Sequence, residues 1–215
     1  CNIDFGSENA NPLYYAENLY LSNSLQKNLL IPEGVTEIKP YAFYNCKSII
    51  SIKLPKSLKK VGSDAFYSCS NIEMVETSDL TTWCNIDFGD SDANPLYYAG
   101  DLYLNGKLVT ELQIPEGVTQ IKKYAFYNCS SLTSITIPDS VTSIGSSAFG
   151  GCTSRTSIII PESVTSIGED AFYACFKLVE VVNKSSHITV TKGAKDNGQV
   201  GYYALAVYNS GDTFA

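Results

Sequence analysis

Apolar positions recur with a fixed period of 23 through most of the chain. The stretch IPEGVTQIKKYAFYNC at 114–129 is followed by IPDSVTSIGSSAFGGC at 137–152 and by IPESVTSIGEDAFYAC at 160–175. The same spacing relates the five phenylalanines Phe43, Phe66, Phe126, Phe149 and Phe172, with one gap between the second and the third. A fixed period of this length is typical of a solenoid, in which each repeat forms one coil.

The pattern within one repeat predicts its elements. Ile135 and Ile137 alternate with polar residues, which favours a strand with one buried face, and Pro138 ends that strand because it cannot donate a ladder hydrogen bond. The residues SVTSIG then turn the chain and can add a second short strand. The segment 146–152 is short and rich in glycine, so we expect a single helical or 3₁₀ turn with Ala148 and Phe149 pointing inward.

Stacked coils of this kind place like residues over like residues at the strand spacing of about 4.8 Å. No coil can bury its apolar face alone, so its neighbours must cover it. The predicted fold is therefore a β-rich solenoid with a parallel strand ladder and short helical or 3₁₀ turns.

A longer period overlies the short one. The motif CNIDFG…ANPLYYA..LYL begins at Cys1 and again at Cys84, and this offset of 83 equals three times 23 plus 14. This predicts three coils and a 14-residue insertion per long unit, with insertions near 1–7 and 77–90. With this alignment of the coils, Leu102 and Tyr103 correspond to Ala125 and Phe126 of the following coil.

The repeat LxxIxIPxxVTxIxxxAFxxCxxL resembles the BspA-like leucine-rich repeats of bacterial surface proteins, over about residues 17–182. The resemblance implies an α/β leucine-rich-repeat solenoid wound as a right-handed superhelix, at the cell surface or otherwise extracellular. It also implies adhesion to host matrix proteins or other cells, and it brings no catalytic residues. Residues 1–182 would form the solenoid, and residues 183–215 would form a C-terminal cap or degenerate last repeat that uses Tyr202, Tyr203, Leu205 and Val207 for packing.

Arg155 departs from the pattern, since Ile49, Ile72, Leu132 and Leu178 occupy its column. A buried unpaired charge is costly, so we expect its stem to lie along the core edge and its head to reach solvent or an acid.

Charge and composition exclude several classes of function. The chain has 215 residues, 44% hydrophobic, with a net charge of −7, which disfavours nucleic acid and anionic membranes as partners. No apolar run approaches the ~18 residues of a membrane helix, so we expect no membrane insertion. The chain starts at Cys1, without a signal segment, which predicts a piece of a longer protein.

The residues that carry chemistry do not form a recognisable site. Five of the seven cysteines fall in one repeat column and are interpreted as buried core residues, with a disulfide between adjacent coils left open. His187 is the single histidine, and Asp87, Asp90 and Asp92 lack the spacing of a calcium loop. Motifs of hydrolases, phosphate binders and dinucleotide binders are missing, so we expect no enzyme activity, no metal and no cofactor.

Surface columns are the best candidates for a binding site. One set lies on the strands between core positions, where residue type varies while the core does not. The other follows each core phenylalanine with a tyrosine, which suits sugar rings or a protein ligand. The candidates are Lys53, Glu76, Gln113, Thr136, Ile159, Ser51, Met74, Glu111, Tyr44, Tyr67, Tyr127 and Tyr173.

Three functions stay open on this interpretation. The first is a non-enzymatic surface protein that binds a protein or glycoprotein, such as host matrix or mucin. The others are a structural spacer in a larger surface protein and a carbohydrate-binding module that uses the tyrosines. The solenoid would be a monomer or associate weakly end to end, because exposed strand edges can pair with another copy. The apolar residues Ile159, Val179 and Val182 would either belong to the binding face or be covered by the C-terminal segment.

Overall fold

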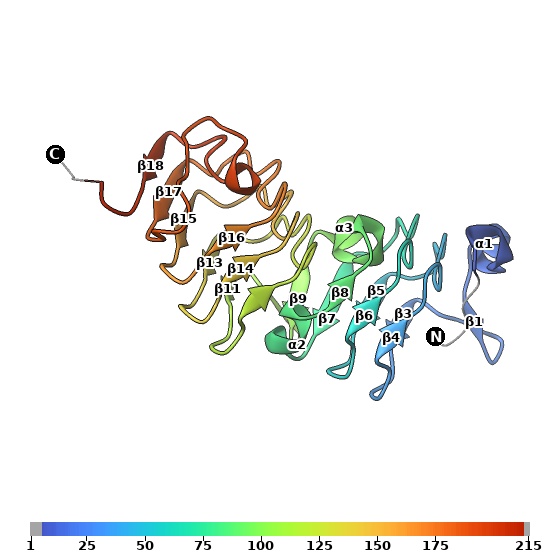
Figure 1. Cartoon of the computed structure of the whole chain (residues 1–215). Helices are drawn as coiled ribbons and strands as arrows, with labels where there is room; N and C mark the ends of the chain where they lie inside the picture. The colour runs from blue at the N-terminus through green and yellow to red at the C-terminus, as the bar shows by residue number, and fades with distance from the viewer. Residues whose placement is uncertain (1–5, 213–215) are drawn as a thin grey trace. The chain divides into compact units, whose positions relative to one another are not determined.

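The computed structural model describes residues 6–212, and this part of the chain divides after Leu108 into two compact units. Each unit is a β-solenoid in which short parallel strands from successive coils form ladders (Figure 1). The predicted stacking of coils is therefore confirmed.

The first unit contains two ladders of parallel strands and two antiparallel hairpins, β1–β2 and β9–β10, of which the second extends the long ladder. The long ladder has the order β10-β9-β7-β5-β3, the second has the order β4-β6-β8, and β1 pairs with β2. The strands are β1 (Tyr20–Leu21), β2 (Ser24–Leu25), β3 (Asn28–Leu30), β4 (Glu37–Ile38), β5 (Ser51–Lys53), β6 (Lys60–Val61), β7 (Met74–Thr77), β8 (Asp87–Phe88), β9 (Leu102–Leu104) and β10 (Lys107–Leu108). The helices are the 3₁₀ turns η1 (Glu8–Ala10) and η2 (Ser91–Ala93) and the short helices α1 (Leu13–Ala16), α2 (Leu80–Cys84) and α3 (Leu96–Ala99).

The second unit repeats the same plan. Its ladders have the orders β11-β13, β15-β17-β18 and β12-β14-β16. The strands are β11 (Glu111–Gln113), β12 (Gln120–Ile121), β13 (Ser134–Thr136), β14 (Ser143–Ile144), β15 (Ser157–Ile160), β16 (Ser166–Ile167), β17 (Glu180–Asn183) and β18 (Ala206–Tyr208), and the 3₁₀ turn is η3 (Asn197–Gln199).

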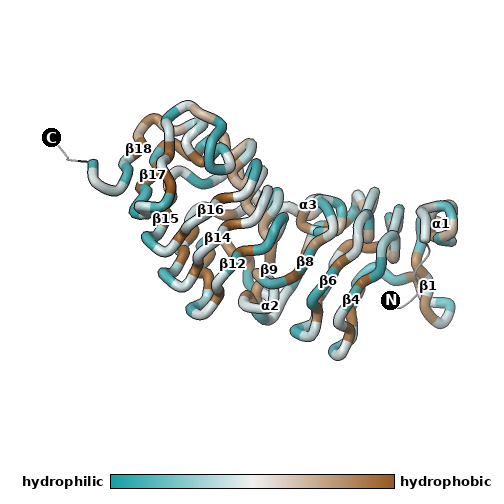
Figure 2. Tube along the Cα trace, viewed as in Figure 1, coloured by the Kyte–Doolittle hydropathy of each residue, from teal (hydrophilic) through white to brown (hydrophobic). Residues whose placement is uncertain are grey.

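Identical side chains stack in the core from coil to coil. Phe43 lies over Phe66 with ring centroids 5.3 Å apart, and Phe149 stacks on Phe126 at 5.4 Å and on Phe172 at 5.6 Å. The apolar segments recur in every coil, as the brown segments in Figure 2 show. Each coil thus forms the wall against which the next coil packs.

The residues around each phenylalanine form consecutive turns and no continuous helix. In one coil, Ala148, Gly150 and Cys152 donate backbone hydrogen bonds to residues three positions earlier, which is the 3₁₀ pattern. Ser147 and Gly151 have positive φ angles of 53° and 75°, and these left-handed residues prevent the turns from merging into a helix.

The extra residues of the long repeat lie in two places, and the predicted single insertion at 77–90 is wrong in this respect. Val75 of β7 pairs with Leu102 of β9, and this step of 27 exceeds the usual period of 23 by four. The four extra residues lie in the β7–β8 connection that contains α2. Leu112 of β11 follows Leu102 by only ten positions, and the β9–β10 hairpin takes up most of this interval.

Leu102 and Tyr103 consequently lie on strand β9. The sequence pattern had instead aligned them with Ala125 and Phe126, in the turn that contains the core phenylalanine. The hairpin turn has Asn105 and Gly106 at φ 50° and 78°. Asn-Gly between apolar residues is the usual signal for such a turn, and it identifies the hairpin from sequence. The insertion expected at 1–7 lies mostly outside the described residues.

The C-terminal segment adds an irregular coil to the second unit. β18 pairs in parallel with β17, and Phe172 donates its backbone N–H to Gly198 O at 2.8 Å, as in a regular coil. Of the residues expected to pack, Leu205 is 71% exposed, Tyr202 is exposed, and Tyr203 and Val207 are half-buried. The buried apolar side chains of this segment are instead Val190, Val200 and Ala204.

Candidate functional site

The outward side chains of β3, β5 and β7 form one continuous surface of the first unit. We call this surface the strand face, and its residues are Asn28, Leu30, Ser51, Lys53, Met74 and Glu76. The parallel register places Leu30, Lys53 and Glu76 in one row and Asn28, Ser51 and Met74 in the next. Four of the six were predicted from the sequence, and the period now brings them together on adjacent strands.

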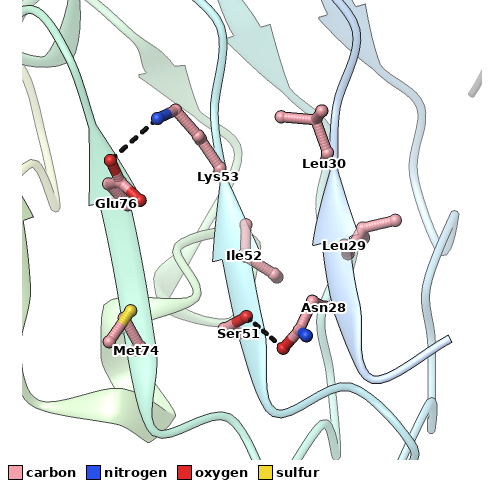
Figure 3. Close-up of a pocket in the computed structure, with 8 residues that line it drawn as sticks. All are labelled: Asn28, Leu29, Leu30, Ser51, Ile52, Lys53, Met74 and Glu76. Carbon is pink, nitrogen blue, oxygen red and sulfur yellow. Dashed lines mark hydrogen bonds and ion pairs between the residues drawn. The ribbon is translucent and has the colours of Figure 1, made fainter. Parts of the chain in front are cut away.

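The strand face is hollowed to a volume of about 270 Å³ (Figure 3). Lys53 Nζ donates to Glu76 Oε1 at 2.8 Å, and Ser51 Oγ donates to Asn28 Oδ1 at 2.7 Å. These polar pairs lie beside two exposed apolar side chains, Leu30 at 65% and Met74 at 37%. The face therefore offers apolar contact area next to charged groups that are already paired.

Sequence reasoning missed Asn28 and Leu30, although the period that related Ser51 to Met74 could have found them. Asn28 lies one period before Ser51, and Leu30 lies one period before Lys53.

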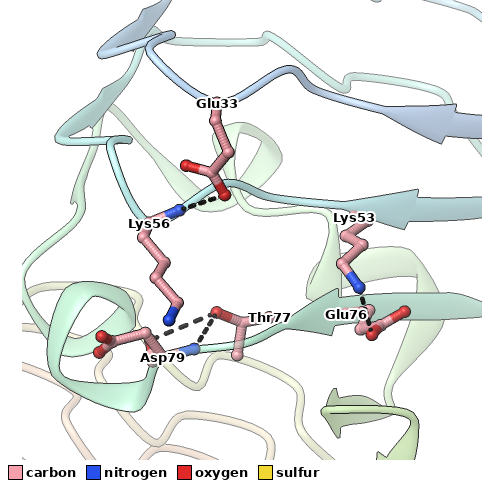
Figure 4. Close-up of polar contacts among 6 residues, drawn as sticks. All are labelled: Glu33, Lys53, Lys56, Glu76, Thr77 and Asp79. Atoms are coloured by element: carbon pink, nitrogen blue, oxygen red, sulfur yellow. Dashed lines mark hydrogen bonds and ion pairs between the residues drawn. The ribbon is translucent and has the colours of Figure 1, made fainter.

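Polar contacts at the ends of these strands hold the neighbouring loops (Figure 4). The backbone N–H of Lys56 donates to Glu33 Oε1 at 3.4 Å, which joins two successive coils. Asp79 donates its N–H to Thr77 Oγ1 and caps α2 by accepting from Thr82 N at 2.9 Å. The loops beside the strand face are thus held by local hydrogen bonds.

The other predicted strand residues belong to the second unit. Glu111, Gln113, Thr136 and Ile159 are all exposed on β11, β13 and β15. Ile159 aligns with Val182 and Tyr208, and it remains 51% exposed. The C-terminal segment extends this sheet at its edge through β18 and does not cover Ile159.

The tyrosine column is only partly available to a ligand. Tyr44 is 9% exposed and stacks on Tyr67 with ring centroids 4.8 Å apart, so one face of each ring is occupied. Tyr127 is half-buried, whereas Tyr67 and Tyr173 are 42% and 50% exposed. Neither Tyr44 nor Tyr67 lines the hollow on the strand face.

The cysteine column is buried and reduced within the described residues. Its members are Cys46, Cys69, Cys129, Cys152 and Cys175, and Cys84, which belongs to α2, is buried as well. Three of the thiols donate to a phenylalanine carbonyl of the preceding coil: Cys69 to Phe43 O at 3.0 Å, Cys152 to Phe126 O at 3.3 Å and Cys175 to Phe149 O at 3.2 Å. Burial raises the pKa of the Cys69, Cys152 and Cys175 thiols, which makes them poor nucleophiles.

The expectation that the Arg155 head reaches solvent or an acid is wrong. Arg155 is fully buried, and its guanidinium carbon lies 5.1 Å from the ring centroid of Phe172 and 5.5 Å from that of Phe149. None of its side-chain nitrogens has a hydrogen-bond partner. Burial lowers the pKa of this guanidinium, the nearby Cys175 and Cys152 side chains act in the opposite direction, and the guanidinium stacks on the two rings.

The aspartates of the long repeat have structural roles. Asp90 accepts from Ala93 N at 2.8 Å and so caps η2, and Asp92 accepts from the Tyr98 hydroxyl at 2.7 Å. Within residues 6–212, no group of three or more histidine, cysteine, aspartate or glutamate side chains is placed to hold a metal ion. His187 is exposed.

Comparison with known proteins places the fold among bacterial leucine-rich-repeat proteins. A leucine-rich repeat protein from Eubacterium ventriosum is 26% identical, with a TM-score of 0.54 over 85% of this chain and 48% of that one. A leucine rich cell surface protein from Faecalibacterium prausnitzii is 22% identical, with a TM-score of 0.45 over 87% of this chain and 60% of that one. The chain thus spans about half the length of the Eubacterium protein.

A search of curated proteins finds no match. Across the described part of the chain, the structure has no helix with the length and apolar character needed to cross a membrane. The model of the BspA type leucine rich repeat region matches residues 16–90 and 100–200 in six copies, and the chain therefore belongs to the BspA-type leucine-rich repeat family.

Proposed function

We propose that the chain is a non-enzymatic binding module displayed outside the cell, and that the strand face of the first unit takes a protein or glycoprotein ligand. The observation that carries the proposal is the combination of exposed Leu30 and Met74 with the paired Lys53 and Glu76 on one rigid sheet. Apolar anchors surrounded by polar groups are typical of protein interfaces. Display outside the cell is the setting that the family implies.

The shape of the strand face favours a macromolecule over a small ligand. Small-molecule sites are usually clefts of roughly 300–1,000 Å³ that enclose most of the ligand. The hollow here is about 270 Å³ and is formed by three parallel strands whose outward side chains are partly solvated. A partner surface can cover such a hollow, whereas a small molecule would remain largely exposed.

The test is binding of the purified chain to immobilised matrix glycoproteins, mucins and polysaccharides. Leu30→Ala and Met74→Ala should each weaken binding to the ligand by about tenfold, the loss expected for a residue near the centre of an interface. Lys53→Glu should weaken it further, because it leaves two carboxylates adjacent. Ser134→Ala and Thr136→Ala are the matched controls, since they alter the equivalent strand positions of the second unit.

Each other outcome identifies a different function. Binding that survives the strand-face changes and is lost in Tyr67→Ala and Tyr173→Ala would identify a carbohydrate module that uses the exposed tyrosines. Failure to bind any surface on the panel, by a protein shown to be folded, would favour the structural spacer.

A further inference from the structure

The dipeptide Asn-Gly occurs twice in the chain, at 105–106 and at 197–198, and the fold holds the two copies differently. In this dipeptide the asparagine amide is open to attack by the next backbone nitrogen, because glycine has no side chain to hinder the approach. Both asparagines have positive φ angles, 50° at Asn105 and 41° at Asn197. The surroundings of each copy therefore decide which of the two can react.

Asn105 and Gly106 form the exposed two-residue turn between β9 and β10. The strand pairing ends with Leu104 opposite Lys107, so the Gly106 nitrogen lies outside the ladder. A Cβ at Gly106 would meet no described atom within 4 Å beyond its chain neighbours, so the space around the turn is open. The backbone N–H of Asn105 donates to Thr77 O at 3.1 Å, whereas its side chain has no hydrogen bond in the described part of the chain. The Asn105 amide can therefore rotate toward the Gly106 nitrogen.

The other copy is held in place by its contacts. The Asn197 side chain donates from Nδ2 to Thr189 O at 2.7 Å. Gly198 is buried, and a Cβ there would lie 2.5 Å from Gly168 O, so its backbone is packed closely against the preceding coil. To react, Asn197 must break its side-chain hydrogen bond and the buried Gly198 must move. Asn197 is therefore protected, although it belongs to the same dipeptide.

We propose that Asn105 is a site of spontaneous deamidation. The Gly106 amide loses its proton to solvent, and its nitrogen attacks Cγ of Asn105. The new C–N bond closes a succinimide ring, and the bond from Cγ to Nδ2 breaks, so that this nitrogen takes up a proton from water and leaves as ammonia. Water then opens the succinimide at either carbonyl and leaves aspartate or isoaspartate. The reaction consumes only water and needs neither an enzyme nor a cofactor.

Isoaspartate at this position would release β10 and leave β9 in place. It adds one carbon to the main chain of a two-residue turn whose positive φ angles, 50° and 78°, match the twist of the strands. Among the described strands, β10 pairs with β9 alone, whereas β9 also pairs with β7. The modified chain should therefore keep its core while Lys107 and Leu108 separate from β9. The proposal is independent of the proposed function, because the turn does not belong to the strand face.

The test is incubation of the purified chain in mildly alkaline buffer, followed by peptide mapping with mass spectrometry and detection of isoaspartate with a protein isoaspartyl methyltransferase. In the folded chain, deamidation at Asn105 should be at least about tenfold faster than at Asn197, which must first break its contacts. In urea the two sites should react at similar rates, because the dipeptide is the same and no fold protects either. The rate at Asn105 should rise with pH, because the attacking nitrogen must lose its proton.

Asn105→Gly is the matched control, because glycine accepts the positive φ of the turn and has no amide to react. Hydrogen exchange at Lys107 and Leu108 should become faster as the parent chain is incubated and stay constant in this variant. Reaction at Asn105 that is no faster than at Asn197 in the folded chain, or that occurs only in urea, would overturn the proposal. Unchanged exchange at Lys107 and Leu108 in chains that contain isoaspartate would overturn the release of β10.

Discussion

Each coil bends through two residues in the left-handed backbone conformation. One precedes the Ala-Phe pair and the other precedes the cysteine. The second position is held by Asn45, Ser68, Asn128, Gly151 and Ala174. Glycine and asparagine tolerate this conformation, whereas alanine is strained there by about 1–2 kcal/mol.

Replacement of Ala174 by glycine should therefore stabilise the protein. Ala174 has φ 56°, and relief of its strain should exceed the entropy cost of glycine, leaving a gain of about 0.5–1 kcal/mol. The measurement is the midpoint of urea unfolding. Ala171→Gly is the control, because Ala171 is buried and is not among the left-handed residues, so this change should lower the midpoint. Equal loss in both variants would contradict the argument.

Arg155 gives a second prediction at this scale. Three unpaired nitrogens are buried, and leucine holds the same column at Leu132 and Leu178. Arg155→Leu should raise the free energy of unfolding by about 1–4 kcal/mol, as do other replacements of buried charge by packed apolar residues. Arg155→Lys keeps the charge and loses the planar stack on Phe149 and Phe172, so it should give no gain. A less stable leucine variant would show that ring stacking outweighs desolvation.

The residue after the second strand of a coil is glycine when that strand pairs with the second strand of the preceding coil. A side chain at Gly62 or Gly145 would place its Cβ 2.4 Å from the backbone nitrogen of Pro40 or Lys123. The first strand of each of these ladders, β4 or β12, is followed instead by Lys39 or Lys122.

Gly145→Ala should destabilise the second unit by at least the ~1–3 kcal/mol typical of overpacking, because the contact is with backbone that cannot rotate away. Lys122→Ala, in the same column at the start of the ladder, should change stability by less than about 0.5 kcal/mol. Urea unfolding of the two variants provides the comparison. A small effect of Gly145→Ala would mean that successive coils can separate slightly without loss of packing.

The regular coils could be predicted from the sequence and the irregular segments could not. The burial of a residue such as Ile135 can be predicted from its position in the repeat, because every coil places the same column against the same neighbours. The β9–β10 hairpin was missed because the offset of 83 gives only the total number of extra residues, and this total does not show where in the repeat they lie. Leu205 was expected to pack because it is apolar, yet the last coil lacks the regular turn and buries Val200 and Ala204 instead. In the candidate site, the period identified four of the six residues of the strand face. The hydrogen bonds between them and the hollow could not be predicted, because they depend on side-chain conformation.

Buried thiols make the stability of the whole molecule sensitive to alkaline pH. Burial raises the pKa of Cys46, Cys69, Cys152 and Cys175, and it raises the pKa of Cys84 to about 12. A folded thiol therefore keeps its proton at a pH where the unfolded thiol, with a pKa near 9, has lost it. The unfolded state then binds fewer protons, so stability falls as pH rises above about 9, by up to about 1.4 kcal/mol per pH unit for each such thiol.

Urea unfolding under reducing conditions at pH 7.5 to 10.5 should show this decline. Cys84→Ala should make the decline shallower, because it removes one thiol that resists ionisation. Tyr98, whose pKa burial also raises, adds to the decline only above its own unfolded pKa near 10. Stability that is constant up to pH 10 would mean that the buried thiols ionise as readily as exposed ones.

The equivalence of Leu19 and Leu102 has a consequence for how such genes change. Both residues begin the same hairpin, and one long repeat separates them. A recombination event that joins one of these positions to the other would delete or duplicate a whole number of coils and keep every core column aligned. Such an event would therefore change the number of coils while the repeat columns stay in register.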